Sequence, residues 1–88
     1  MRLGLTGNLR RYVDYDFAIE LPARTVHEAV RLLGERYPRA RPVLFDGAGD
    51  VRSIHRLVLN GTVLGRGELG CAVGPGDELL ILTPITGG

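Results

Sequence analysis

Two glycines, Gly87 and Gly88, are the residues of this sequence whose type and position suggest chemistry. They follow shortly after an apolar run, Leu-Leu-Ile-Leu, at residues 79–82. Terminal glycines have no use in packing, because they lack side chains and ordering them costs more backbone entropy than ordering any other residue. A bare Gly-Gly tail can instead enter a narrow channel in a second protein and present its terminal carboxylate. The alternative interpretation is a frayed chain end.

The other residues capable of acid–base, nucleophilic or metal chemistry do not form a convincing group. His27 and His55 are far apart in the sequence, and we expect His27 at the surface of a first helical turn and His55 at a strand edge. Cys71 lies in a glycine-rich loop with no histidine nearby, which favours an inert side chain over a reactive thiol. The adjacent carboxylates of Asp77 and Glu78 fit a turn and a strand start. No spacing of Cys, His and carboxylate residues is typical of a metal site.

The composition favours one small globular domain. The chain has 88 residues, 44% of them hydrophobic, which allows one modest core. Its net charge of +1 gives no reason to expect a nucleic acid or a membrane as partner. The sequence shows no signal peptide and no apolar run of membrane-spanning length, so we expect a cytoplasmic protein. All eleven basic residues are arginines, so the chain offers no lysine for isopeptide linkage to itself.

Alternating and apolar segments predict five strands, at residues 2–6, 16–21, 55–59, 63–64 and 78–83. Asn60-Gly61 favours a type I′ turn between the third and fourth strands. The four consecutive apolar residues at 79–82 are typical of a strand that is buried on both faces. Residues 9–14 are interpreted as a long connection between the first two strands.

One amphipathic helix is predicted between Thr25 and Tyr37. Thr25 is a suitable N-cap, and Glu28 three residues later completes a capping box. Pro38 ends the helix. An apolar stripe with the spacing i, i+3, i+4, i+7 consists of Val26, Ala29, Val30 and Leu33. Such a stripe covers one face of a sheet.

This order of elements predicts an α+β fold of the ubiquitin-like β-grasp type, a mixed sheet wrapped over one main helix with the first and last strands paired at its centre. We expect a domain at residues 1–83 and a flexible C-terminal tail at residues 84–88. The predicted core combines one parity of the last strand with Leu3, Leu5, Phe17, Ile19, Val26, Val30, Leu33, Leu57 and Leu59. The second face of the sheet should expose an apolar patch bordered by arginines, unless residues 39–53 fold over it. Within that segment, Leu44 and Phe45 should fill or cover the rim of the core.

The end of the chain resembles the MoaD/ThiS type of ubiquitin-like sulfur carriers. Residues 76–88 are similar to the family's ending of Gly-Asp-Glu, an apolar strand, proline, an apolar residue, a small residue and Gly-Gly. Weaker matches are residues 9–10, 25–28 and 58–61. The length is closer to the molybdopterin synthase small subunit and the cysteine-synthesis carrier than to the thiazole carrier. The single Pro84, where the molybdopterin carriers usually have two prolines, leaves the pathway open.

The resemblance implies a protein co-substrate with no bound cofactor rather than an enzyme. A ubiquitin-activating-type adenylating enzyme would use ATP to adenylate Gly88, and a sulfur source would then convert the acyl-adenylate into a thiocarboxylate. A sulfur-accepting biosynthetic enzyme, such as a large synthase subunit, would take this sulfur into molybdopterin, cysteine or another metabolite. Gly87 would keep the tail thin enough for the channel. The residues expected to bind the partner enzymes are Pro84, Ile85, Thr86, Leu80 and Leu82.

Two other functions remain open. A ubiquitin-like modifier would join Gly88 to a lysine of a target protein, and it would also begin with adenylation. A non-catalytic β-grasp binding module would carry its terminal glycines without using them.

Overall fold

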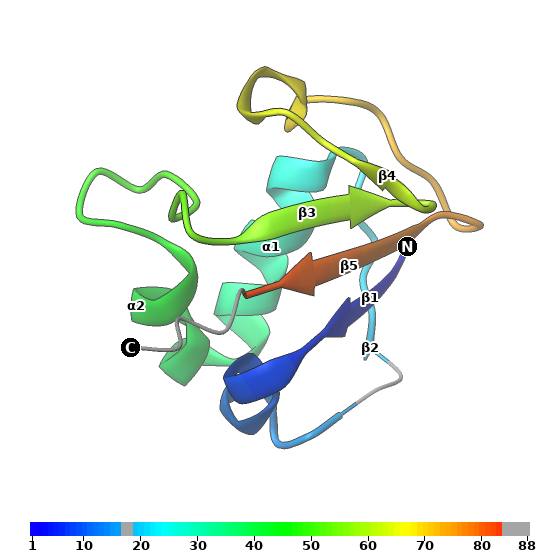
Figure 1. Cartoon of the computed structure of the whole chain (residues 1–88). Helices are drawn as coiled ribbons and strands as arrows, with labels where there is room; N and C mark the ends of the chain where they lie inside the picture. Colours follow the sequence, from blue (N-terminus) through cyan, green and yellow to red (C-terminus); the bar gives the residue numbers. More distant parts are fainter. Residues whose placement is uncertain (17–18, 84–88) are drawn as a thin grey trace.

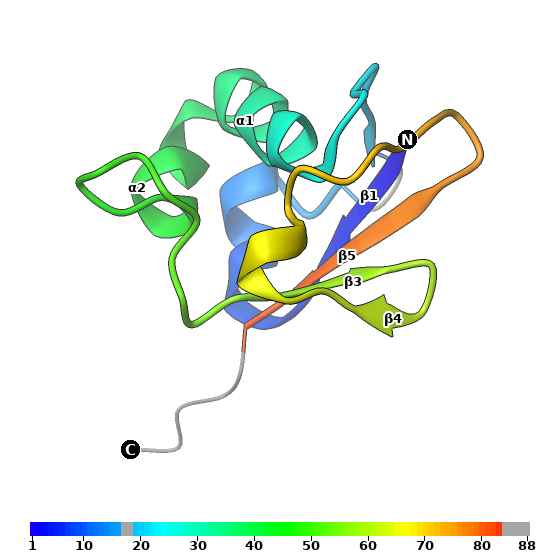
Figure 2. The ribbon, with the colours of Figure 1, turned by 90° about the horizontal axis from the view of Figure 1, so that it is seen from above.

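The computed structural model describes residues 1–16 and 19–83. They form one mixed sheet of five strands in the order β2-β1-β5-β3-β4, and the helices lie on one side of it (Figures 1 and 2). The strands are β1 (Arg2–Leu5), β2 (Ile19–Glu20), β3 (Arg56–Leu59), β4 (Thr62–Val63) and β5 (Glu78–Leu82). The α-helices are α1 (Val26–Arg36) and α2 (Arg41–Leu44). The predicted α+β class and β-grasp arrangement are therefore confirmed. No helix in the described part of the chain has the length and apolar character needed to cross a bilayer.

The centre of the sheet is a parallel pair of strands from the two ends of the sequence. β1 pairs with β5 in a register that places Leu3 opposite Leu79, and β5 pairs on its other side with β3 in the antiparallel sense. The amide of Arg2 donates to the Asp77 carbonyl at 2.9 Å, which extends the parallel ladder by one bond. The predicted central pair is thus confirmed.

The start of α1 follows the predicted capping chemistry with one difference. The Thr25 hydroxyl oxygen accepts a hydrogen bond from the amide of Glu28 at 3.1 Å, which confirms the N-cap. The Glu28 carboxylate, however, accepts from the amide of Arg24 at 2.7 Å, one residue before the position that a capping box requires. Both bonds satisfy backbone donors near the helix start. At the other end the helix stops at Arg36, before Pro38.

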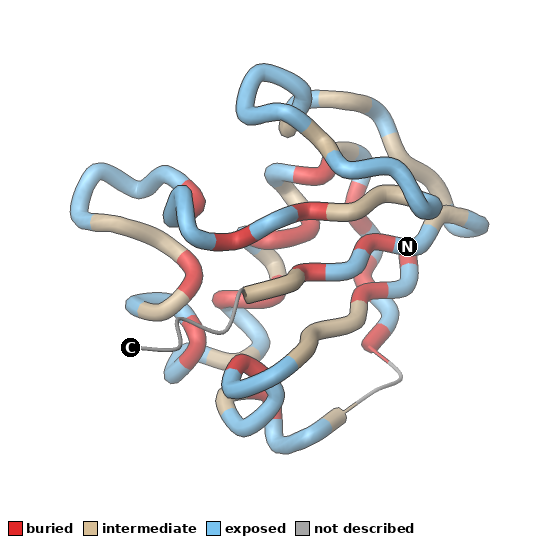
Figure 3. Tube along the Cα trace, in the orientation of Figure 1, coloured by how far each residue is buried: buried red, intermediate tan, exposed pale blue. Residues whose placement is uncertain are grey.

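The core lies between α1 and the sheet (Figure 3). Of the predicted core residues, those that are buried are Leu3, Ile19, Val26, Val30, Leu33 and Leu57, and Leu79 with Ile81 supplies the inward parity of β5. Leu5 and Leu59 are half-buried and pack against this core. Phe17 lies outside the described residues.

The connection after β1 is more ordered than the sequence predicted. A 3₁₀ helix spans Gly7–Val13, and Leu9 and Val13 are both buried. Their four-residue spacing puts them on one side of a helical turn, and burying them offsets the cost of ordering the segment. The predicted strand at residues 16–21 is reduced to Ile19–Glu20 among the described residues.

The hairpin strands differ from the predicted positions by one residue at the start of β3 and at both ends of β4, whereas β3 ends at Leu59 as predicted. β3 begins at Arg56 rather than His55, and β4 is Thr62–Val63. Asn60 and Gly61 have φ values of 49° and 87°, as a type I′ turn requires, so that prediction is confirmed.

Residues 39–53 fold on the helix side of the sheet and add α2 to that layer (Figure 2). Leu44 is fully buried and Phe45 half-buried, as predicted. Ala40 and Val51 also belong to the core, which the sequence pattern did not indicate. Because the segment packs beside α1, it does not cover the second face of the sheet.

Replacing Leu33 by alanine should lower the free energy of unfolding by about 2–5 kcal/mol, because this fully buried side chain would leave a cavity against the sheet. Urea-induced unfolding measures the change. The matched control is Leu80→Ala, because Leu80 is 37% exposed on the other side of the sheet. Equal losses in the two variants would contradict the assignment of the core face.

Candidate functional site

We define the outer face as the face of the sheet that points away from α1. Strand register places Gly4, Leu80, Val58 and Val63 in one apolar row across it, because alternate residues of a strand share a face. Leu80 is 37% and Val63 is 56% exposed, so the predicted exposed patch is confirmed. The expectation that residues 79–82 are buried on both faces is wrong at Leu80. The helices cover one side of the sheet only, so the outward residues of an apolar strand stay accessible.

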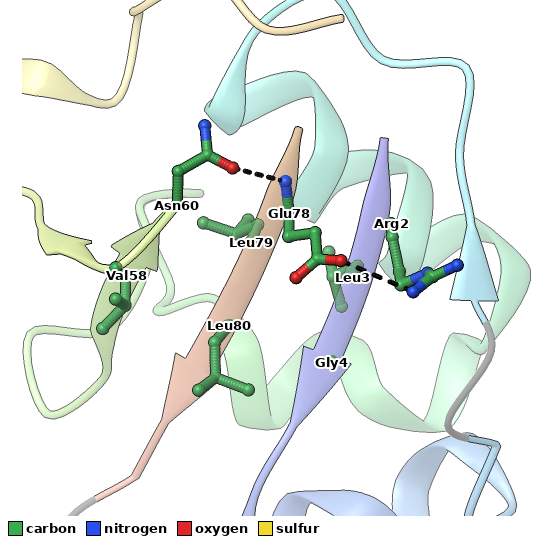
Figure 4. A pocket seen from close by; sticks show the side chains of 9 residues that line it. Arg2, Leu3, Gly4, Val58, Asn60, Glu78, Leu79 and Leu80 are labelled. Carbon is green, nitrogen blue, oxygen red and sulfur yellow. Dashed lines mark hydrogen bonds and ion pairs between the residues drawn. The ribbon is translucent and has the colours of Figure 1, made fainter. Parts of the chain in front are cut away.

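A shallow hollow of about 300 Å³ lies in the middle of the outer face (Figure 4). Leu80 leans over Gly4, and a Cβ atom added at Gly4 would come within 3.3 Å of the Leu80 Cδ1 atom. Glycine at this position therefore leaves room for the leucine side chain to lie along the sheet. The result is an apolar depression whose border is polar at Arg2, Asn60 and Glu78.

Arginines border the apolar row on both sides along the strand direction, as predicted. Arg2 forms exposed ion pairs with Glu78 (Nη1 to Oε1, 3.4 Å) and with Glu20 (Nε to Oε1, 3.6 Å). Exposed pairs of this kind contribute little to stability, but they hold the guanidinium beside the hollow. On the opposite side of the row, Arg56 pairs in register with Leu82, which is half-buried.

Asp77 and Asn60 hold the turn that leads into β5. The Asn60 side-chain amide donates to the Asp77 carboxylate at 2.9 Å, and the Asn60 side-chain oxygen accepts from the amide of Glu78 at the same distance. The amide of Gly74 also donates to Asp77, at 2.7 Å. The hydrogen bond from Asn60, followed by that from Gly74, lowers the pKa of Asp77 below its ordinary value of 3.8. Asp77 is therefore a structural anchor of β5, in agreement with the predicted turn.

The sequence analysis placed His55 wrongly. It is 8% exposed rather than at an accessible edge. Its Nε2 atom lies 2.7 Å from the Val43 carbonyl oxygen in α2, and its Nδ1 atom lies 3.0 Å from the Thr83 hydroxyl oxygen. The sequence contains no signal of these two contacts, because both partners are distant from His55 along the chain.

The predicted tail residues, Pro84, Ile85, Thr86, Gly87 and Gly88, lie outside the described residues. The structure therefore places only Leu80 and Leu82 of the predicted site. The two lie on the same face of β5 by strand alternation. That strand ends at Leu82, and Thr83 is the last residue described.

The remaining candidate residues show no sign of a second centre. His27 is exposed in the first turn of α1, as predicted, and its ring lies edge-on to Phe45 with centroids 6.4 Å apart. Cys71 is half-buried, and its carbonyl accepts a hydrogen bond from the amide of Val26. Within residues 1–16 and 19–83, no three His, Cys, Asp or Glu side chains come together as metal ligands would.

Comparison with known proteins gives a family match and several structural matches. The family model described as "ThiS family" matches residues 4–88. A search of curated protein sequences finds no match. The structural matches described below are each under 25% identical in sequence, so they show the fold alone.

Three solved structures illustrate the likeness. SAMP1 from Haloferax volcanii has a TM-score of 0.85 at 24% identity, with 100% of this chain and 98% of that chain covered. SAMP1 from Methanosarcina acetivorans has a TM-score of 0.85 at 22% identity, with 99% and 94% covered. A chain of the BexX/CysO complex from Amycolatopsis orientalis has a TM-score of 0.81 at 23% identity, with 98% and 97% covered.

The free energy of unfolding should fall on acidification as Asp77 takes up a proton. Its pKa is lowered in the native state, so its stabilising contribution is complete above about pH 3.8 and is lost as the pH falls through the lower native value. Asp77→Asn should show a shallower decrease in urea unfolding experiments between about pH 5 and pH 2. Asp50→Asn, at an exposed loop position, is the matched control and should keep the wild-type slope. An unchanged slope in Asp77→Asn would contradict the anchoring role.

Proposed function

This chain belongs to the ThiS family, and we propose that its place in that family is to carry sulfur as a thiocarboxylate on Gly88. Members of the family are carriers rather than catalysts. The observation that carries the proposal is the family match, which extends over residues 4–88 and so includes both the β-grasp domain and the Gly-Gly sequence. The structure adds that β5, which leads directly into residues 84–88, is fixed at the centre of the sheet.

The proposed chemistry takes place in two steps on the carboxylate. A carboxylate is a poor acyl donor, since its leaving group would be oxide. In the first step the Gly88 carboxylate attacks the α-phosphate of ATP in an adenylating enzyme, which releases pyrophosphate and forms an acyl-adenylate. In the second step a sulfide sulfur attacks the acyl carbon, AMP leaves, and the product is a thiocarboxylate. Five extended residues beyond Thr83 span at most about 18 Å, which suits a buried active site in another protein.

The outer face is the surface that we propose for docking of the adenylating enzyme. Exposed apolar patches with polar borders are typical of interfaces, and the row around Leu80 has this character. The row belongs partly to β5, so a protein that binds it lies close to the base of the tail. In our proposal Leu80 and Leu82 contact the partner, and Pro84, Ile85 and Thr86 lead into its channel.

The acceptor is proposed at the level of its class. A biosynthetic enzyme would take the sulfur into molybdopterin, cysteine or another sulfur-containing metabolite. Support for an enzyme as partner comes from the structural likeness to a chain of the BexX/CysO complex. Isolation of the protein that binds the thiocarboxylate form, followed by assay with candidate acceptors, would identify the pathway.

A second candidate function is protein modification. Its support is the likeness in fold to two proteins whose names describe them as small archaeal modifier proteins. Both functions begin with adenylation of Gly88, and they differ in the nucleophile that follows. Intact mass of the protein from cells separates them, because a carrier shows oxygen replaced by sulfur and a modifier appears in larger adducts.

Deleting Gly87 and Gly88 should abolish sulfur loading and leave the melting temperature nearly unchanged, because we expect the end of a chain to add little to folding stability. The measurement is intact mass after incubation with the adenylating enzyme, ATP and sulfide. A second variant, with one residue added after Gly88, keeps both glycines. It should also fail to load, since its terminal carboxylate belongs to the added residue. Sulfur on the truncated chain would overturn the proposal and direct attention to Cys71.

Leu80→Ala should raise the KM of the adenylating enzyme for this protein about tenfold, because Leu80 lies at the centre of the proposed docking surface. The folding stability should change little. Tyr15→Ala provides the comparison, since Tyr15 is also a large exposed side chain (60%) but lies outside the apolar row. ATP–pyrophosphate exchange measures both variants. Similar KM values for Leu80→Ala and the wild type would argue against docking on the outer face.

A further inference from the structure

His55 is the one buried residue with a polar or charged side chain among the described residues, and both of its ring nitrogens have partners. One partner is the backbone of α2 at Val43, and the other is the side chain of Thr83. The ring therefore connects the helix layer to the point where the last strand ends. The two bonds join segments 12 and 28 residues away from His55 in the sequence.

The partners determine which nitrogen carries the hydrogen in the neutral ring. A carbonyl oxygen only accepts, so the Nε2 atom must carry the hydrogen that it donates to Val43. In the neutral ring, Nδ1 is then an acceptor, and the Thr83 hydroxyl donates to it. The bond to Val43 fixes the ring orientation, much as a second partner orients a catalytic or metal-binding imidazole. The Thr83 hydroxyl is thus bonded to an imidazole ring whose orientation is fixed by its bond to Val43.

The position of Thr83 gives this bond its importance. The last register pair between β3 and β5 is Arg56 with Leu82, so the strand ladder ends one residue before Thr83. The hydrogen bond from the Thr83 side chain continues the attachment past the end of the ladder. It fixes the residue from which residues 84–88 continue.

We infer that His55 is a positioning residue, which acts through Thr83 to set the direction in which the chain leaves the sheet. This inference rests on the proposed function, in which Gly88 must reach the active site of an adenylating enzyme. A tail that follows an oriented Thr83 loses less conformational freedom on binding than one that pivots at Leu82. The benefit falls on binding rather than on the chemical step, because the enzyme's own channel aligns the carboxylate once the tail is inside.

Thr83→Val is the variant that tests the inference. Valine has nearly the shape of threonine and replaces the hydroxyl group by a methyl group, so the bond between His55 and Val43 and the fold should remain. Thr83→Ser is the matched control, because it keeps the hydroxyl and loses a methyl group. With the adenylating enzyme, ATP and sulfide, Thr83→Val should raise KM roughly 2- to 12-fold, the equivalent of one neutral hydrogen bond, with kcat unchanged. Thr83→Ser should stay close to the wild type. A wild-type KM in Thr83→Val, or an equal rise in Thr83→Ser, would overturn the positioning role.

A second measurement needs only the isolated chain. NMR of the ¹⁵N-labelled imidazole should show His55 as the Nε2–H tautomer in the wild type. Heteronuclear NOE values at residues 85–88 should be lower in Thr83→Val than in the wild type and in Thr83→Ser, and equal values in all three would overturn the inference. If the wild-type chain gains no sulfur in the loading assay, the proposed function fails, and the NMR comparison still decides whether His55 orients the chain end.

Discussion

The arrangement of this protein depends on one constraint: its helices all lie on one side of the sheet (Figure 2). In β1, β3 and β5, therefore, one side-chain parity faces the core and the other faces away from the helices. Burial of the inward parity, including Leu3, Leu79 and Ile81, supplies the stable core. No helix packs on the outward side chains, so Gly4 and Leu80 form part of a shallow apolar surface. The placement of the helices on one side of the sheet thus accounts for both the core of the domain and its candidate docking surface.

β5 combines these two roles within five residues. Its inward side chains complete the core, its outward side chains contribute to the apolar row, and its end leads to Thr83. Both ends of the strand are anchored by side chains from elsewhere, by Asn60 through the Glu78 amide and by His55 through the Thr83 hydroxyl. A strand that is fixed at its start, middle and end gives a defined origin for whatever follows it.

The sequence predicted the parts of the fold that depend on local patterns. The capped helix at Thr25, the type I′ turn at Asn60-Gly61 and the central pairing of the first and last strands all follow from periodicity, turn chemistry and element order. Contacts between distant segments were not predictable. Nothing near His55 in the sequence points to Val43 or Thr83, and the 3₁₀ helix at Gly7–Val13 buries only Leu9 and Val13, a pattern that fits a loop equally well. The apolar run at residues 79–82 led to a wrong prediction at Leu80 for the same reason. The position of the helices, and not the strand itself, decides which faces of the sheet are covered.

The parallel pairing of β1 with β5 also affects how the chain reaches its native state. Arg2 lies opposite Glu78, a separation of 76 residues, so the middle of the sheet closes the longest loop available in the domain. Loop closure of this length has to precede the gain from the central ladder, which favours slow folding relative to helical domains of similar size. During translation β1 is made long before β5, and among the described residues its other neighbour, β2, pairs with it at two register positions. The sheet can close only after β5 has been synthesised, and until then Leu3 lacks Leu79, its register partner in the native ladder.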